Sequence, residues 1–250
     1  MTPAARERWR VRAPMLFFSV AAWMLLFLEP SLVPLPVLCP AGMQTMPSSA
    51  SLQMQVISRP SSFAMDWVLM LAAMMAPLLI APVRHVRDRS FSRRRARATG
   101  QFVAAYVAIW IAVGVILLAL VMAARLATSE SSFLLAITAV ALIWQFSPIK
   151  QRCLNRCHSH PALAAFGLPA DLDALRFGLT HGIWCVGSCW ALMLLPLVVS
   201  RGHLALMAAI TLWFAAERLE TPNPPRWRWR YPSKAARIVA AQAQMWLQRS

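Results

Sequence analysis

The stretch FGLTHGIWCVGSCWALMLLPLVV, residues 177–199, decides the fold of this chain. It contains no Asp, Glu, Lys or Arg, and about 20 apolar residues in a helix are enough to cross the hydrocarbon core of a bilayer. The stretch therefore predicts a transmembrane helix. A histidine, two cysteines and a methionine recur in it at every fourth position, and this pattern points to a site as well as to a span.

The composition of the whole chain indicates an integral membrane protein. Of its 250 residues, 59% are hydrophobic and 14% are charged, whereas soluble domains carry about 25% charged residues. The net charge of +16 does not indicate a nucleic-acid partner, because the basic residues stand in blocks between apolar runs rather than along one surface. Such blocks are typical of the cytoplasmic segments of multi-pass proteins.

Apolar runs of suitable length recur along the chain. They predict an all-α, polytopic membrane helix bundle of about six transmembrane helices, at residues 14–29, 63–83, 101–124, 133–149, 177–199 and 203–217. We expect a basic N-terminus over residues 1–13, the bundle over 14–217 and a basic tail over 218–250.

The basic residues predict the orientation of the bundle. With both termini in the cytoplasm, every Lys and Arg falls on the cytoplasmic side except Arg59, Arg125 and Arg201. Positively charged loops mark the cytoplasmic side of membrane proteins. The Pro- and Ser-rich segment 30–62, which contains Cys39, is then the long outer loop.

Within residues 177–199, soft metal donors occupy one side of the predicted helix. His181, Cys185, Cys189 and Met193 are each four residues apart, so they form a stripe about 18 Å long. An imidazole inside a span is costly to bury and indicates a functional site. One helix cannot gather all four donors around an ion, so we expect His181 with Cys185, or Cys185 with Cys189, completed by another helix.

A second cluster, KQRCLNRCHSH, follows the fourth span at residues 150–160. Cys153 and Cys157 are four residues apart, and His158 follows at once. In a reducing compartment such thiols bind metal more readily than they form a disulfide. We expect this segment to continue the fourth helix beyond the inner membrane face. The two thiol pairs then form successive stations, or one site if segment 150–175 folds back.

Methionines in MDWVLMLAAMMAP, residues 65–77, suggest which metal is bound. Met70 and Met74 share a helix face, although methionine is also an ordinary apolar filler. Thiols, thioethers and imidazoles together favour Cu(I), whereas zinc accepts Cys and His but fits the methionines less well. No Ser-His-Asp set or paired carboxylates are recognisable, so we expect a protein that is not an enzyme.

The motifs resemble a bacterial family of polytopic inner-membrane proteins. The resemblance rests on QFSPIKQRCLNRC, on LRFGLTHGIWCVGSCWALMLL, whose core is H-G-x-x-C-x-G-x-C-W, on the apolar span ending in AAERL, and on the Met-rich stretch from Trp67 to Pro77. The family consists of predicted metal-binding membrane proteins, some of them copper chaperones for tyrosinase-like oxidases. One departure is Ser188, where many members have a further cysteine.

The resemblance implies a multi-pass inner-membrane protein that binds Cu(I) and delivers it to a copper-dependent client enzyme, with the lipid bilayer as its environment. By the resemblance, Cys153, Cys157, His181, Cys185 and Cys189 are family-type positions, and Met70, Met74 and Met75 match the family's methionine-rich span. From the resemblance together with the residue patterns above, we expect the metal ligands to be Cys153, Cys157, His158, His181, Cys185, Cys189, Met70 and Met74. Two alternatives stay open. One is a membrane thiol–disulfide oxidoreductase that uses the cysteine pairs as a relay, and the other is a structural assembly partner that binds no metal.

Overall fold

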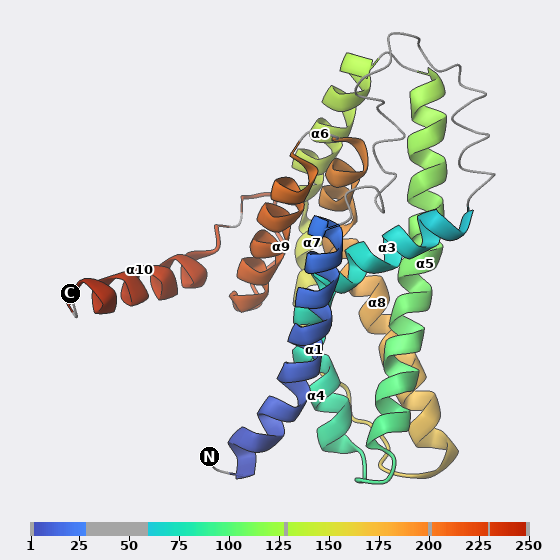
Figure 1. Ribbon diagram of the computed structural model, residues 1–250, viewed down its shortest axis with the longest axis vertical. Coiled ribbons are helices and arrows are strands. Elements are labelled where there is room, and N and C mark those ends of the chain that lie inside the picture. The colour runs from blue at the N-terminus through green and yellow to red at the C-terminus, as the bar shows by residue number, and fades with distance from the viewer. Residues whose placement is uncertain (1–2, 29–59, 128–129, 200–201, 230, 249–250) are drawn as a thin grey trace.

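The fold was determined from a computed structural model, which describes residues 3–28, 60–127, 130–199, 202–229 and 231–248. Within these ranges the chain is helical and contains no strand, which confirms the predicted all-α class (Figure 1). The elements are α1 (Pro3–Leu28), α3 (Pro60–Met75), the 3-10 helix η3 (Ala76–Leu79), α4 (Ile80–Arg89), α5 (Arg95–Ala127), α6 (Glu130–Phe146), α7 (Pro148–Arg156), α8 (Gly167–Val198), α9 (His203–Leu219) and α10 (Ser233–Leu247).

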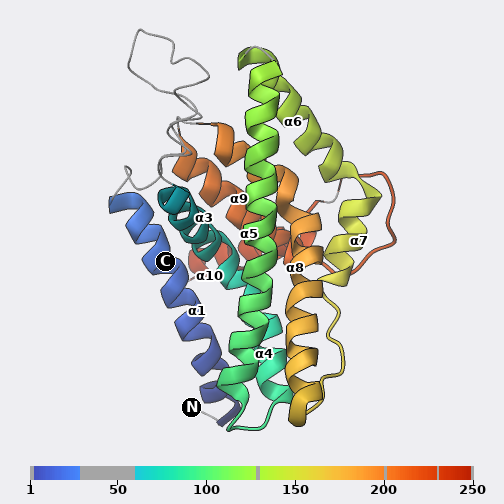
Figure 2. The ribbon, with the colours of Figure 1, turned by 90° about the vertical axis from the view of Figure 1, so that its right-hand side faces the viewer.

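Helices α5 and α8 lie side by side along much of their length (Figure 2). Glycines on α8 allow this close approach. A Cβ atom added at Gly178 would lie 2.8 Å from the Cβ of Ala105, and one added at Gly182 would lie 3.1 Å from the Cβ of Ile109. Small residues at helix interfaces let backbones approach closely, as is common in membrane helix pairs.

A proline break in the second apolar run docks it against α1. Pro77 has no N–H group, so the carbonyl of Ala73 loses its helical donor. Two α1 side chains replace that donor: Ser19 Oγ donates to Ala73 O at 2.8 Å, and Trp23 Nε1 donates to the same oxygen at 3.1 Å. The run therefore continues through η3 into α4 while its freed carbonyl remains satisfied.

The fourth apolar run breaks where we expected it to continue. Between α6 and α7 the helix axis bends by 62° at Ser147. Ser147 caps α7 by accepting a hydrogen bond from the Ile149 backbone N–H at 3.0 Å, and Pro148 occupies the first turn, where no N–H donor is needed. The prediction of a continuous helix was wrong, because these two residues end α6 and start α7 in a new direction against α8.

In the part of the chain that the structure describes, four helical segments are long and apolar enough to cross a membrane: Trp9–Leu28, Trp67–Arg89, Arg95–Ala124 and Gly167–Val198. The bent pair α6–α7 makes a fifth if it counts as one span. Large apolar side chains lie exposed on the outer faces of these helices, Phe17, Val115 and Leu135 among them. Exposed apolar surface of this kind is typical of helices that face lipid.

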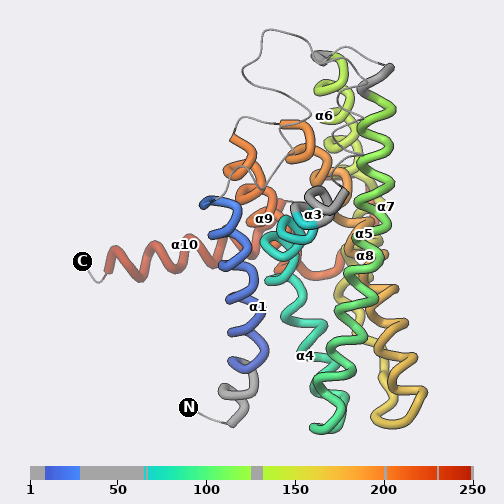
Figure 3. Tube along the Cα trace, turned by 45° about the vertical axis from the view of Figure 1, so that its right-hand side comes forward, coloured from blue at the N-terminus to red at the C-terminus, as the bar shows by residue number. Residues whose placement is uncertain are grey.

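Helix α10 has no buried residues and extends away from the bundle (Figures 1 and 3). The segment that precedes it packs on α7. Asn155 Nδ2 donates to the Asn223 carbonyl at 2.7 Å, and the Arg226 backbone N–H donates to Gln151 Oε1 at 3.0 Å. The C-terminal segment therefore packs along α7 before the chain leaves the bundle.

Candidate metal centre

The predicted stripe on α8 faces the interior of the bundle. His181, Cys185, Cys189 and Met193 are all buried, and their exposed fractions do not exceed 3%. Their fourfold spacing keeps them on the side of α8 that packs against the other helices. The soft donors are thus held among other side chains and point away from the exposed face of the helix.

Helix α7 brings a second pair of thiols to the same region of α8. Cys153 and Cys157 are buried free thiols, as are Cys185 and Cys189. Cys153 packs directly on Gly187, since a Cβ atom added there would lie only 2.5 Å from Cys153 Sγ. A side chain at position 187 would displace the Cys153 thiol, so this glycine leaves the space that the thiol occupies.

The thiols are surrounded by polar groups from three other positions. Tyr106 on α5 places its hydroxyl 3.2 Å from Cys185 Sγ, and Arg218 on α9 donates from Nη2 to the same sulfur at 3.2 Å. Ser188 Oγ lies 3.3 Å from Cys189 Sγ and donates to the Cys185 carbonyl at 2.8 Å. Two polar side chains therefore approach the sulfur of Cys185, and one approaches the sulfur of Cys189.

Because α7 folds back against α8, the two cysteine pairs lie in one region of the bundle. Cys157 at the end of α7 is close enough to Cys185 on α8 for the two thiols to interact electrostatically. Even so, no three His, Cys, Asp or Glu side chains in the described part of the chain are placed to hold one ion together. The arrangement therefore offers pairs of thiols, and Cys185 interacts with both Cys157 and Cys189.

The predicted histidine ligands occupy different surroundings. The ring of His181 lies among those of Phe177, Phe102 and Tyr106, at centroid distances of 5.7, 6.0 and 6.1 Å. Within the described residues it forms no hydrogen bond. These aromatic rings therefore surround the imidazole of His181, which lies one helical turn before Cys185 on α8.

His158 faces the backbone rather than the sulfurs. Its Nδ1 lies 2.9 Å from the Leu154 carbonyl and its Nε2 lies 3.1 Å from the Arg218 carbonyl. In this conformation both ring nitrogens of His158 are engaged, so His158 ties the end of α7 to α9.

Burial and the neighbouring ring of His85 lower the pKa of His160, which keeps that imidazole neutral at pH 7.

The predicted methionine ligands lie in the main hydrophobic core. Met70 and Met74 on α3 are buried, and the same core contains Met193 and Met207 together with three of the cysteines. Ordinary packing accounts for the burial of these methionines. Their thioether sulfurs are also soft donors of the kind that Cu(I) prefers.

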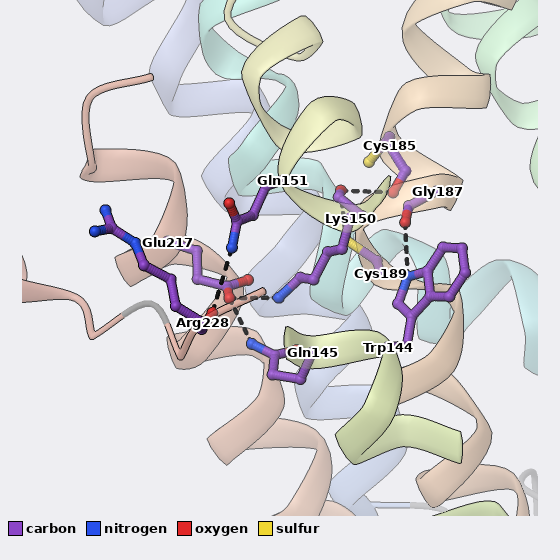
Figure 4. A network of polar contacts seen from close by, with 10 residues as sticks. Trp144, Gln145, Lys150, Gln151, Cys185, Gly187, Cys189, Glu217 and Arg228 are labelled. Carbon is purple, nitrogen blue, oxygen red and sulfur yellow. Dashed lines mark hydrogen bonds and ion pairs between the residues drawn. The ribbon is translucent and has the colours of Figure 1, made fainter. Parts of the chain in front are cut away.

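The sequence analysis missed a buried ion pair beside the thiols. Lys150, which we had counted among the cytoplasmic cations, is only 2% exposed and pairs with Glu217 on α9 (Figure 4). Gln145 Nε2 also donates to Glu217 Oε1, at 2.6 Å. The sequence contains one signal of such a pair, which is the carboxylate of Glu217 in AAERL, directly after an apolar run.

This polar network joins the helices that carry the cysteines. Gln151 on α7 donates from Nε2 to the Arg228 carbonyl at 3.3 Å, and Trp144 on α6 donates from Nε1 to the Gly187 carbonyl at 2.9 Å (Figure 4). Together with the ion pair, these bonds fix α6, α7 and α9 around the thiol-bearing turns of α8.

The fold and the site define a class of protein: a helix bundle, with helices apolar enough to cross a membrane, that gathers free thiols in its interior. Residues 64–241 match the family described as PpoB2: Copper chaperone, and the chain belongs to this family. The resemblance found in the sequence is thereby confirmed. Neither the curated proteins nor the solved structures gave a match.

Proposed function

We propose that this chain is a multi-pass inner-membrane chaperone that binds Cu(I) and passes it to a copper-dependent enzyme. The observation that carries the proposal is the convergence of four buried free thiols, from α7 and α8, on one region of the bundle. The copper-chaperone family supplies the metal and the class of activity. Copper is the cargo, and the proposed role requires no catalysis.

The donor set supports Cu(I) over other metals. Thiolates and thioethers select Cu(I), whereas Mg²⁺ and Ca²⁺ require oxygen ligands. Cu(I) also accepts two soft ligands, which suits a site that offers thiols in pairs. Zinc prefers four ligands in structural sites, and a set of three or more is not assembled by the described His, Cys, Asp and Glu side chains.

We propose that the bundle has six spans and both termini in the cytoplasm. The distribution of Lys and Arg supports this orientation. Helix α9 then counts as a span with its 17 residues, and α6 continues through the bend into α7. Cys153, Cys157, Cys185 and Cys189 receive copper from the cytoplasmic side in this scheme. The thioethers of Met70 and Met74 lead it outward.

Measuring the metal content of the purified chain tests this function. Protein isolated in detergent under reducing conditions, from cells supplied with copper and zinc, is expected to contain copper near one equivalent and little zinc. Cys39 lies outside the described residues, and a Cys39→Ser variant serves as a control that should retain the copper.

Two outcomes would contradict the proposal. A chain without metal that forms a quinone-dependent disulfide between its cysteines would be an oxidoreductase. A chain with neither metal nor disulfide would be a structural assembly partner.

A further inference from the structure

We infer that Arg218 is a specificity-determining residue that makes the thiol site select a monovalent soft cation over a divalent one. The inference rests on the proposed function and deepens it, because it explains how one site discriminates between Cu(I) and Zn(II). It is carried by the position of the guanidinium group, by the absence of a carboxylate beside it among the described residues, and by the number of thiols that can share an ion.

Contacts of both its side chain and its backbone carbonyl fix the position of Arg218. It lies in the last turn of α9, and its half-buried side chain donates from Nη2 to Cys185 Sγ at 3.2 Å. Its backbone carbonyl lies 3.1 Å from His158 Nε2, next to Cys157 at the end of α7. The guanidinium group is thus held against the sulfur of Cys185, which interacts with both Cys157 and Cys189.

No carboxylate balances this charge within the described residues. The neighbouring Glu217 pairs with Lys150 and also accepts from Gln145. Glu220 accepts from the Lys234 backbone N–H at 2.6 Å and from Ser233 Oγ at 3.4 Å. The positive charge of Arg218 instead faces thiols, so the region has one unit of positive charge while the thiols are protonated.

The charge balance differs between the two metals. When two thiols bind Cu(I), both lose their protons and the complex carries one negative charge, which the guanidinium neutralises. When the same two thiolates bind Zn(II), the complex is neutral, and the charge of Arg218 stays uncompensated. Three thiolates around Zn(II) would also balance it, but no three such donors in the described ranges are placed around one ion.

The size of the effect follows from the surroundings. Charges a few ångströms apart interact strongly when partly removed from water, and uncompensated charges in such sites are costly. A structural role alone, in which Arg218 only joins α7 to α9, would affect both metals equally. The ratio of the two affinities therefore separates specificity from stability.

The test measures the affinities of the full-length protein in detergent for Cu(I) and for Zn(II), each by competition with a chromophoric chelator. Arg218→Gln is expected to weaken Cu(I) binding by at least about tenfold, while Zn(II) binding is unchanged or stronger. Arg218→Lys, which keeps the charge, is expected to retain most of the wild-type preference. Arg156→Gln is the matched control, since Arg156 lies over the ring of Trp184 and not against a thiol.

An equal loss of both metals in Arg218→Gln, or an unchanged affinity ratio in a well-folded variant, would overturn the inference. Loss of the preference in Arg218→Lys would also overturn it, because the charge would not be the cause. If the wild-type chain bound no Cu(I), the proposed function itself would fail. If the wild-type chain bound Cu(I) but Arg218→Gln left the ratio of the Cu(I) and Zn(II) affinities unchanged, only the inference about Arg218 would fail.

Discussion

Replacing both Cys185 and Cys189 with serine is expected to reduce the affinity for Cu(I) by about 100-fold or more. The substitution is nearly isosteric, so the packing of α8 is retained while two soft donors become hard oxygens that Cu(I) does not favour. Loss of a group that only orients a ligand already costs about 10- to 100-fold in metal affinity, and loss of the ligands costs more. Chelator competition and the copper content of the purified variant measure the effect.

The single and paired variants show which thiols share the ion. Cys185 interacts with Cys157 as well as with Cys189, so Cys185→Ser should lose more affinity than Cys189→Ser. A Cys153→Ser and Cys157→Ser double variant should also lose affinity if α7 supplies a ligand. Cu(I) binding unaltered in the Cys185 and Cys189 double variant would exclude α8 as the site.

Breaking the Lys150–Glu217 pair is expected to lower stability more than other single polar substitutions in the bundle. Both side chains are buried, with exposed fractions of 2% and 3%. Removing one partner of a buried pair costs about 3–5 kcal/mol, because the other charge stays buried and unpaired. For a chain of this size, Lys150→Met or Glu217→Gln should lower the apparent melting temperature in detergent by roughly 6 °C or more.

Matched variants separate the pair from general damage. Lys234→Met makes the same substitution on α10, where the side chain forms no ion pair within the described residues, and should leave the melting temperature nearly unchanged. The Lys150→Met, Glu217→Met double variant removes both charges and should recover much of the loss. A double variant no more stable than either single one would argue against a charge effect.

The sequence predicts most of the fold, because long apolar runs have few alternatives to a helix in a membrane. Nearly all of each predicted run is helical in the described residues; the exceptions are Ser147, where the fourth run breaks, and Val199, which follows the end of α8. The burial of His181, Cys185, Cys189 and Met193 on α8 also follows from their fourfold spacing. These are local properties, set by composition and by the geometry of one helix.

The assembly of the site is not predictable in the same way, because it depends on contacts between distant segments. The position of α7 is set by the bend at Ser147 and by the space that Gly187 leaves for Cys153. The sequence pattern had left open whether the two thiol pairs meet. The burial of Lys150 was not predicted, because a lysine beside an apolar run usually marks the membrane boundary, and only the fold brings Glu217 to it.

X-ray absorption at the copper edge of the Cu(I)-loaded protein tests the central claim most directly. The account predicts a low-coordinate Cu(I) ion with sulfur as its main scatterer, and a shell that loses sulfur when Cys185 and Cys189 are replaced by serine. A shell of nitrogen and oxygen, or a sulfur shell unaltered by that double substitution, would contradict the claim that the thiols between α7 and α8 hold the metal.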